Sequence, residues 1–124
     1  MKNLLLVVGA ILLGISPTVQ AEYSTENKII KVVIPQASAS GLASIYNHVE
    51  AYAKKQNINL VPVYKPGANG NIGTEFVARS PADGYTLIVN TLSHNVNPLM
   101  NPGVVKYDPV KDFAPIILAA ETNA

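Results

Sequence analysis

The sequence predicts an α/β fold: an open, mainly parallel sheet with helices on both of its faces. Three observations carry this prediction. Residues 29–34 form a nearly continuous β-branched run, which is typical of a buried strand in a parallel sheet. Two further strand-like runs follow at 60–64 and 85–90, and a segment with helical character separates each strand from the next. This alternation of strand and helix implies right-handed crossovers within one sheet.

The first helix is predicted at 41–57. Its apolar residues fall at helical spacing, with polar residues on the opposite side; they are Leu42, Ile45, Tyr46, Val49, Tyr52 and Ala53. A serine before the helix, Ser38 or Ser40, is expected to cap it. Glu50 and Lys54 are four residues apart and should form an ordinary ion pair on the helix surface.

The second strand, at 60–64, contains Pro62, which cannot donate a hydrogen bond within a sheet and therefore indicates an edge strand. A short helix is predicted at 72–79, with Asn71 as its N-cap. A Pro-Ala-Asp-Gly turn at 81–84, in which Gly84 takes a positive φ, leads into the third strand at 85–90. With the second strand at the edge, the spatial order of the strands is 2-1-3.

This order places a switch point between strands 1 and 3, and open α/β sheets bind ligands beside the carboxyl ends of strands at such a point. The loops at 35–41 and 90–97 are therefore the predicted ligand walls. They offer hydroxyls, amides and backbone N–H groups, which suit a carboxylate, although the serines of the first loop could instead serve only as helix caps. The candidate ligand contacts are Gln36, Ser38, Ser40, Gly41, Asn69, Asn90, Thr91, Ser93 and His94.

No catalytic residue, metal site or cofactor is predicted. No second His, Cys or carboxylate lies at ligand spacing from His94, so we expect a loop histidine that makes one hydrogen bond. The glycine-rich loop at 67–73 lacks the spacing of nucleotide-binding motifs and should supply turn geometry beside the cleft. Asp83, Asp108 and Asp112 are expected to be structural. No Gly-x-Ser-x-Gly motif is present, so an enzyme is not expected.

Composition narrows the class of partner. The 124 residues include nine Lys and Arg against eight Asp and Glu, and 48% of them are hydrophobic. This balance offers no basic stripe for a nucleic acid. The chain has no cysteine, which excludes disulfides, thiolate zinc sites and thiol nucleophiles. Its length accommodates one domain at most.

The first 21 residues have the layout of a secretory signal peptide. A short positive start precedes an apolar run at 4–15, and Val19 and Ala21 are small residues at the positions that a signal peptidase reads. A membrane anchor is the alternative. However, the apolar run spans about 18 Å as a helix, well short of a hydrocarbon core of about 30 Å. Residues 1–21 are therefore predicted to be removed, and residues 22–124 to form the exported chain.

The other end of the chain carries an apolar run at 115–120, after a loop-like stretch. A run of this kind normally leads into a further strand or domain. We therefore expect the chain to be the N-terminal portion of something longer.

Four segments together resemble the extracytoplasmic solute-binding receptors of tripartite tricarboxylate transporters, the Bug or TctC-like family. They are Lys-Pro-Gly-Ala-Asn-Gly-Asn-Ile-Gly at 65–73, Ser-Pro-Ala-Asp-Gly-Tyr-Thr-Leu at 80–87, Asn97-Pro98, and Tyr-Asp-Pro-Val-Lys-Asp-Phe-Ala-Pro at 107–115. The segment at 36–43 departs from the family's usual Pro-Gly-Gly and Asp pattern. Asn69 replaces a glycine of the family's Gly-Ala-Gly-Gly pattern, a mild change because Asn tolerates positive φ.

The resemblance implies part of one lobe of a type II periplasmic-binding-protein (Venus-flytrap) fold, with the second lobe absent from this chain. It also implies a monomeric receptor that closes on a small carboxylate or amino-acid ligand and passes it to the permease subunits of a tripartite transporter. Two other hypotheses stay open. One is a truncated receptor that acts as an interaction module for a permease or sensor, or that has no function. The other is a secreted hydrolase that uses His94.

Overall fold

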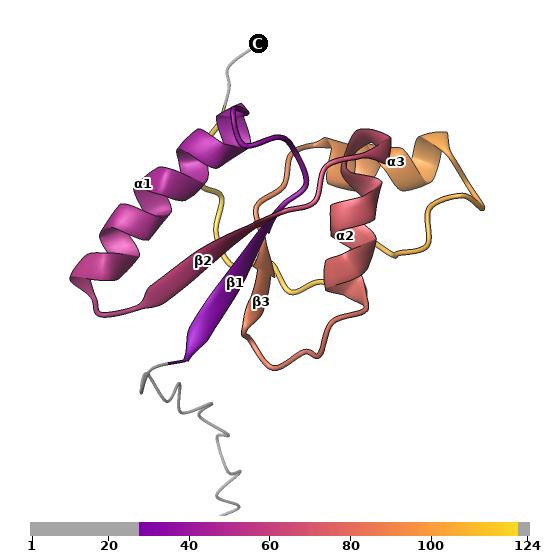
Figure 1. Ribbon diagram of the computed structural model, residues 1–124. Helices are drawn as coiled ribbons and strands as arrows, with labels where there is room; N and C mark the ends of the chain where they lie inside the picture. Colours follow the sequence, from indigo (N-terminus) through magenta and orange to yellow (C-terminus); the bar gives the residue numbers. More distant parts are fainter. Residues whose placement is uncertain (1–27, 122–124) are drawn as a thin grey trace, which may run out of the picture.

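The elements of the molecule alternate as the sequence predicts. The structure is a computed structural model that describes residues 28–121, so the predicted signal peptide lies outside the described residues. Along the chain the elements are β1 (Ile29–Ile34), α1 (Gly41–Lys55), β2 (Asn59–Tyr64), the 3-10 turn η1 (Ala68–Gly70), α2 (Asn71–Ala78), β3 (Thr86–Ile88) and α3 (Ser93–Met100). Figure 1 shows their arrangement.

The three strands form one parallel sheet in the order β2-β1-β3, which confirms the predicted order. Val33, near the end of β1, pairs with Val63 of β2 on one side and with Ile88 of β3 on the other. Pro62 lies in β2, at the edge of this sheet, where its missing N–H costs least. Because both pairs are parallel, all three carboxyl ends lie at one edge of the sheet.

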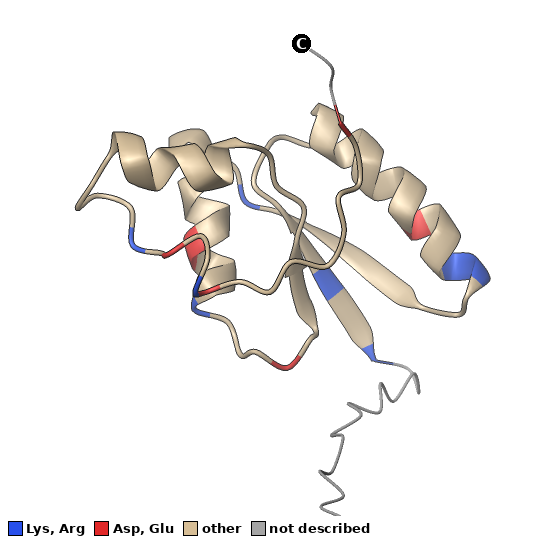
Figure 2. Ribbon diagram, turned by 180° about the vertical axis from the view of Figure 1, so that it is seen from behind, with Lys and Arg blue, Asp and Glu red and all other residues tan. Residues whose placement is uncertain are grey.

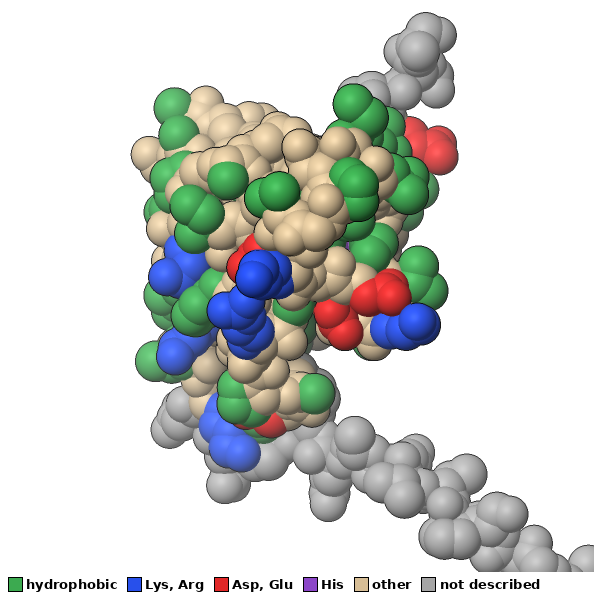
Figure 3. Space-filling view, turned by 90° about the vertical axis from the view of Figure 1, so that its right-hand side faces the viewer, with side chains coloured by type: hydrophobic (Ala, Val, Ile, Leu, Met, Phe, Trp, Pro, Cys, Tyr) green, Lys and Arg blue, Asp and Glu red, His purple; other side chains and the backbone are tan. Residues whose placement is uncertain are grey.

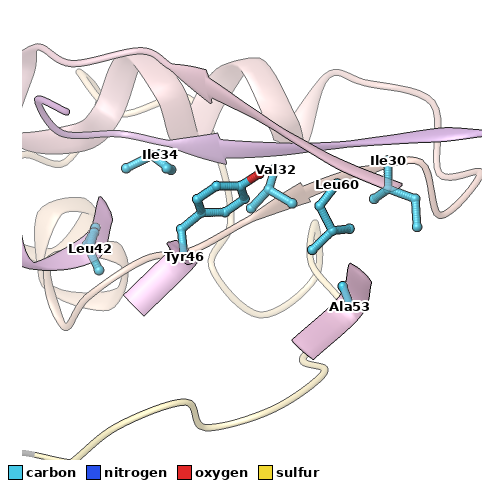
Figure 4. Packing of buried hydrophobic residues seen from close by; sticks show 7 residues of the cluster. All are labelled: Ile30, Val32, Ile34, Leu42, Tyr46, Ala53 and Leu60. Carbon is cyan, nitrogen blue, oxygen red and sulfur yellow. The ribbon is translucent and has the colours of Figure 1, made fainter. Parts of the chain in front are cut away.

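Helices lie on both sides of the sheet, as predicted (Figure 1). Alternate residues of β1 face α1 and form the main core; Figure 4 shows this cluster of Ile30, Val32, Ile34, Leu42, Tyr46, Ala53 and Leu60. Val33 points to the opposite face, toward α2 and α3, and is also fully buried. Burial of each such side chain contributes about 1.5–3 kcal/mol, so β1 is the most strongly anchored strand.

The start of α1 follows the capping prediction. Ser40 is the N-cap, and its hydroxyl oxygen accepts a hydrogen bond from the backbone N–H of Ala43 at 3.3 Å. The basic residues Lys54 and Lys55 occupy the last turn, where they complement the helix dipole. The predicted surface pair is present, with Lys54 Nζ 3.1 Å from a Glu50 carboxylate oxygen.

Three element predictions need correction. Residues 90–97 are not a loop throughout, because α3 begins at Ser93. The segment is rich in Asn and contains Pro98, which are poor helix formers, so only its tertiary contacts explain why it is helical. The N-cap of α2 is Gly70 in the left-handed region, and Asn71 is already helical. The strand β3 is also shorter than the predicted 85–90.

Apolar side chains remain exposed on the side of the molecule formed by α2 and α3 (Figure 3). Leu99 is 80% exposed, and Met100, Val104 and Val110 are similar. The apolar run at 115–120 forms no helix or strand, and Ile117 within it is 81% exposed. Within residues 28–121, no helix is long and apolar enough to cross a membrane.

Tyr46 is the one large polar group inside the α1 core. Its side chain is 2% exposed, and its hydroxyl has no hydrogen-bond partner among the described residues. An unpaired buried hydroxyl costs about 1–3 kcal/mol relative to one in water. Burial and the nearby Glu50 carboxylate raise the pKa of Tyr46 to about 12. The ring therefore stabilises the core through its apolar surface and not through its hydroxyl.

We predict that Tyr46→Phe leaves the free energy of unfolding unchanged or raises it by about 1 kcal/mol. The raised pKa means that the unfolded chain releases the phenol proton first, at about pH 10, so wild-type stability falls as the pH rises from 10 toward 12. Tyr46→Phe should lose less stability in that window. Urea unfolding at pH 7 and pH 10.5 measures both effects.

The control is Tyr52→Phe, because Tyr52 is 67% exposed on the same helix. It should change stability by less than about 0.5 kcal/mol and keep the wild-type pH dependence. A clear loss of stability in Tyr46→Phe at pH 7 would show that the hydroxyl has a partner and contradict the prediction.

Candidate functional site

Three loops begin side by side at the carboxyl edge of the sheet. The backbone N–H of Lys65 donates to the carbonyl of Ile34 at 3.0 Å, and that of Val89 donates to the carbonyl of Val33 at 3.1 Å. The helix α2 also approaches this point closely, because a Cβ added at Gly73 would lie 2.9 Å from the Cβ of Pro35. The structure thus brings together the ends of the two predicted ligand walls.

The first wall, after β1, is an exposed turn that leads into α1. Ser38 and Gly41 are exposed, and a Cβ added at Gly41 would meet no atom within 4 Å. Gln36 is half-buried at the start of the turn. The hydroxyl oxygen of Ser40 accepts the capping hydrogen bond of α1, so its capping role is established. A ligand contact of Ser38 or Ser40 stays a prediction.

The second wall, after β3, is a group of polar side chains that bond to one another. The hydroxyls of Thr91 and Ser93 lie 2.9 Å apart. The Asn90 side chain donates to the Thr74 hydroxyl at 3.0 Å and accepts from the Thr91 N–H at 2.9 Å. Asn90 is half-buried and connects this wall to Thr74 of α2, whereas Thr91 is exposed to solvent.

His94 lies in α3 and not in a loop, and it makes two hydrogen bonds instead of the one predicted. Its Nδ1 lies 3.2 Å from the Asn90 Nδ2, and its Nε2 lies 3.2 Å from the carbonyl oxygen of Pro109. The amide can only donate to Nδ1, so the bond to the carbonyl places the proton on Nε2. The ring also stacks on Tyr107 with centroids 5.5 Å apart. These partners are structural, and neither hydrogen-bond partner is a carboxylate that could activate a base.

A set of asparagines that the sequence analysis did not connect lies between α3 and the loop before α2. Asn97 is 4% exposed and bonds to residues on both sides of Gly70. Its side chain accepts from the Asn69 Nδ2 at 2.7 Å, donates to the Asn69 carbonyl at 2.9 Å, and donates to the Asn71 Oδ1 at 2.7 Å. Asn69, one of the candidate ligand contacts, is therefore committed to Asn97 through its side chain.

The loop that Asn97 contacts has an unusual backbone. Four successive residues have positive φ, namely Gly67 at 127°, Ala68 at 46°, Asn69 at 54° and Gly70 at 88°. The left-handed conformation costs a residue with a Cβ about 1–2 kcal/mol, so Ala68 in particular is strained. The structure confirms that Asn69 adopts the positive φ expected of it and that this loop supplies turn geometry.

Tyr107 compensates for the proline inside α3. Pro98 has no N–H, so the carbonyl of His94, four residues earlier, lacks its helical partner. The hydroxyl of Tyr107 donates to this carbonyl at 3.1 Å. Tyr107 is 7% exposed, and burial raises its pKa. The segment 107–115 is thus bonded to α3, the helix that contains Asn97-Pro98.

Three aspartates have the structural roles expected of them. Asp83 accepts from the backbone N–H of Tyr85 at 2.9 Å, in the turn where Gly84 has a φ of 79°. Asp108 accepts from the N–H groups of Val110 and Lys111, which lower its pKa, and Asp112 accepts from the N–H of Asp108 at 2.7 Å. No group of three His, Cys, Asp or Glu residues in the described part of the chain could hold a metal ion.

The two predicted walls are uncharged, since neither 35–41 nor 89–97 contains Asp, Glu, Lys or Arg. Most charged residues lie elsewhere on the molecule (Figure 2). Lys65 begins the third loop at this edge, and its ammonium group lies over the Phe76 ring, 4.2 Å from the centroid. An open hollow of about 590 Å³ lies between α3 and the turn at 107–110, lined in part by Asn95, Leu99 and Val110. None of its lining residues is a candidate ligand contact.

These features define a parallel α/β segment of the kind found in periplasmic binding proteins. A solved structure described as a periplasmic transporter matches with 35% identity and a TM-score of 0.65, over 69% of this chain and 29% of that chain. A UPF0065 protein from the tcbD-tcbE intergenic region of Pseudomonas sp. (strain P51) is 38% identical over 56 residues, which are 45% of this chain and 16% of that protein. No protein-family model matches the chain.

The matches establish a relationship to a solved periplasmic transporter and to a UPF0065 protein, and the first of them shows the fold of part of a lobe. The chain spans less than a third of either relative. The ligand and the partners of the whole protein are therefore proposed below.

We predict that Tyr107→Phe lowers the free energy of unfolding by about 1–2 kcal/mol, because it leaves the partly buried carbonyl of His94 without a donor. Chemical denaturation monitored by circular dichroism measures this loss. Tyr46→Phe removes the same atom from an unpaired hydroxyl and is the matched comparison. Equal stability of the wild type and Tyr107→Phe would show that the hydroxyl does not replace the missing N–H of Pro98.

Proposed function

We propose that this chain is part of the solute-binding component of a tripartite carboxylate transport system of the Bug or TctC-like type. Residues 1–21 direct it to the periplasm as a cleaved signal peptide. The receptor captures a small carboxylate or amino acid and delivers it to membrane permease subunits. The observation that carries this proposal is the meeting of two polar, uncharged walls at the carboxyl edge, after β1 and β3.

The chemistry of the two walls suits a carboxylate that is bound by hydrogen bonds. The first wall offers exposed Ser38 and the N–H groups at the start of α1, beside the positive end of the helix dipole. The second wall offers the paired hydroxyls of Thr91 and Ser93. His94 and Asn69 are bonded within the protein, so we assign them to the support of the walls.

Capture requires a second lobe that closes over this edge. The walls line an open surface, and an open surface cannot exclude water from a small ligand. Receptors of the proposed class enclose ligands by hinge closure between two lobes. The solved periplasmic transporter is more than three times the length of the part that this chain covers, which leaves room for such a lobe.

A second candidate function is favoured by the exposed apolar side chains near α3. A truncated receptor with this surface could act as an interaction module that docks on a permease or a sensor. Recovery of the permease from detergent-solubilised membranes by the immobilised chain, without any bound solute, would favour this function over solute capture.

We predict that the chain alone binds small carboxylates and amino acids only weakly, at millimolar concentrations or above. Titration with succinate, citrate and glutamate, followed by amide chemical shifts, should perturb 38–41 and 90–93 and leave the turn at 81–84 unchanged. Thr91→Val removes an exposed hydroxyl at constant shape and should weaken the response, whereas Thr86→Val in β3 should not.

Two outcomes would contradict the proposal in different ways. Micromolar affinity of the isolated chain, measured by calorimetry, would show that no second lobe is needed. Perturbations that avoid both walls at every concentration of all three compounds would show that this edge is not the carboxylate site.

A further inference from the structure

The Gly67–Gly70 loop does not hold its own conformation. Ala68 and Asn69 both carry a Cβ in the left-handed region. The backbone bonds across the loop are two short-range ones, from the Gly70 N–H to the Gly67 carbonyl at 2.9 Å and from the Asn71 N–H to the Ala68 carbonyl. A loop of this kind needs contacts from outside to exclude the conformations that these residues prefer. The contacts of Asn69 identify their source as α3.

Asn97 of α3 uses its whole side-chain amide on this loop. The Asn97 Nδ2 donates one hydrogen bond to the Asn69 carbonyl and one to the Asn71 Oδ1. The Asn97 Oδ1 accepts a hydrogen bond from the Asn69 Nδ2. The two partners lie on either side of Gly70, where the backbone passes from left-handed to right-handed helical dihedrals. A single buried side chain therefore spans the point at which α2 begins.

We propose that Asn97 is a positioning residue that locks the Gly67–Gly70 loop in its left-handed conformation and so fixes the start of α2 against the end of β1. The close approach at Gly73 shows why this start must be fixed, because α2 packs there directly on Pro35, the first residue of the first ligand wall. The inference that Asn97 thereby shapes a ligand site rests on the proposed function. The inference that Asn97 locks the loop is independent of that function.

The geometry makes Asn97→Asp the sharpest test. The substitution keeps the shape of the side chain and the acceptor for Asn69, but it removes both donors and places a carboxylate against two oxygens, the Asn69 carbonyl and the Asn71 Oδ1. Asn95→Asp is the matched control, since it makes the same change on the same helix at an exposed position.

The experiment is amide hydrogen exchange by NMR on the protein and both variants. In Asn97→Asp the Gly70 N–H should exchange at least tenfold faster, while the N–H groups of β1 change less than twofold. Asn95→Asp should resemble the wild type at every position. If Asn97 were merely part of the packing, Asn97→Asp would accelerate exchange in β1 and the loop alike, and this outcome would overturn the proposal.

Two further measurements keep the test decisive if Asn97→Asp does not fold. Asn97→Ala removes the bonds without adding a charge and should show the same local acceleration at Gly70. In the unaltered protein, the side-chain amide protons of Asn97 should exchange with water at least tenfold more slowly than those of Asn95. Equal exchange at these two side chains would contradict the proposal by itself, and neither result depends on a ligand.

Discussion

The position of β1 in the middle of a parallel sheet is the constraint on which the rest of the structure depends. Val33 and Ile34 are both completely buried, on opposite faces, and their own carbonyls accept hydrogen bonds from the first residues after β3 and β2. A buried central strand fixes where its neighbours end, so three loops far apart in the sequence start within hydrogen-bonding distance of one strand. The candidate ligand edge is a direct result of this topology.

Polar side chains form the second layer of organisation. Asn90, Asn97 and Tyr107 bond to backbone groups that lack a regular partner, at a strand end, in a left-handed loop and beside a proline within a helix. A buried network of this kind rigidifies its surroundings when each member is satisfied. It also explains why α3 is helical despite its sequence, since its side chains are held from outside. The hydrogen bonds of these side chains thus support the backbone that carries the second wall.

Much of the fold could be predicted from the sequence, because local patterns determine it. The β-branched runs indicate strands, the helical spacing of apolar residues indicates helices, and Pro62 indicates an edge strand. The three parallel strands, their order, the Ser40 cap and the Asp83 turn were predicted on this basis and are confirmed. The helix α3, the Gly70 cap and the two bonds of His94 were not predicted. Their long-range partners, such as Pro109 for His94 and Asn97 for the residues beside Gly70, are not encoded in any local pattern. The segments that carry the family resemblance contain Asn69, Asn97 and Tyr107. The presence of these three residues in the resembling segments was the available signal that they belong together.

The central claim is that the two polar walls lie together at one edge of the sheet, and paramagnetic broadening tests it most directly. The chain has no cysteine, so Ser38→Cys gives a single site for a spin label in the first wall. The label should broaden the amides of Thr91 and Ser93 strongly. It should spare the turn at Asp83, because the six residues of β1 separate the two ends of the sheet by about 20 Å. Equal broadening at Asp83 and Thr91, or sharp signals in the second wall, would contradict the account.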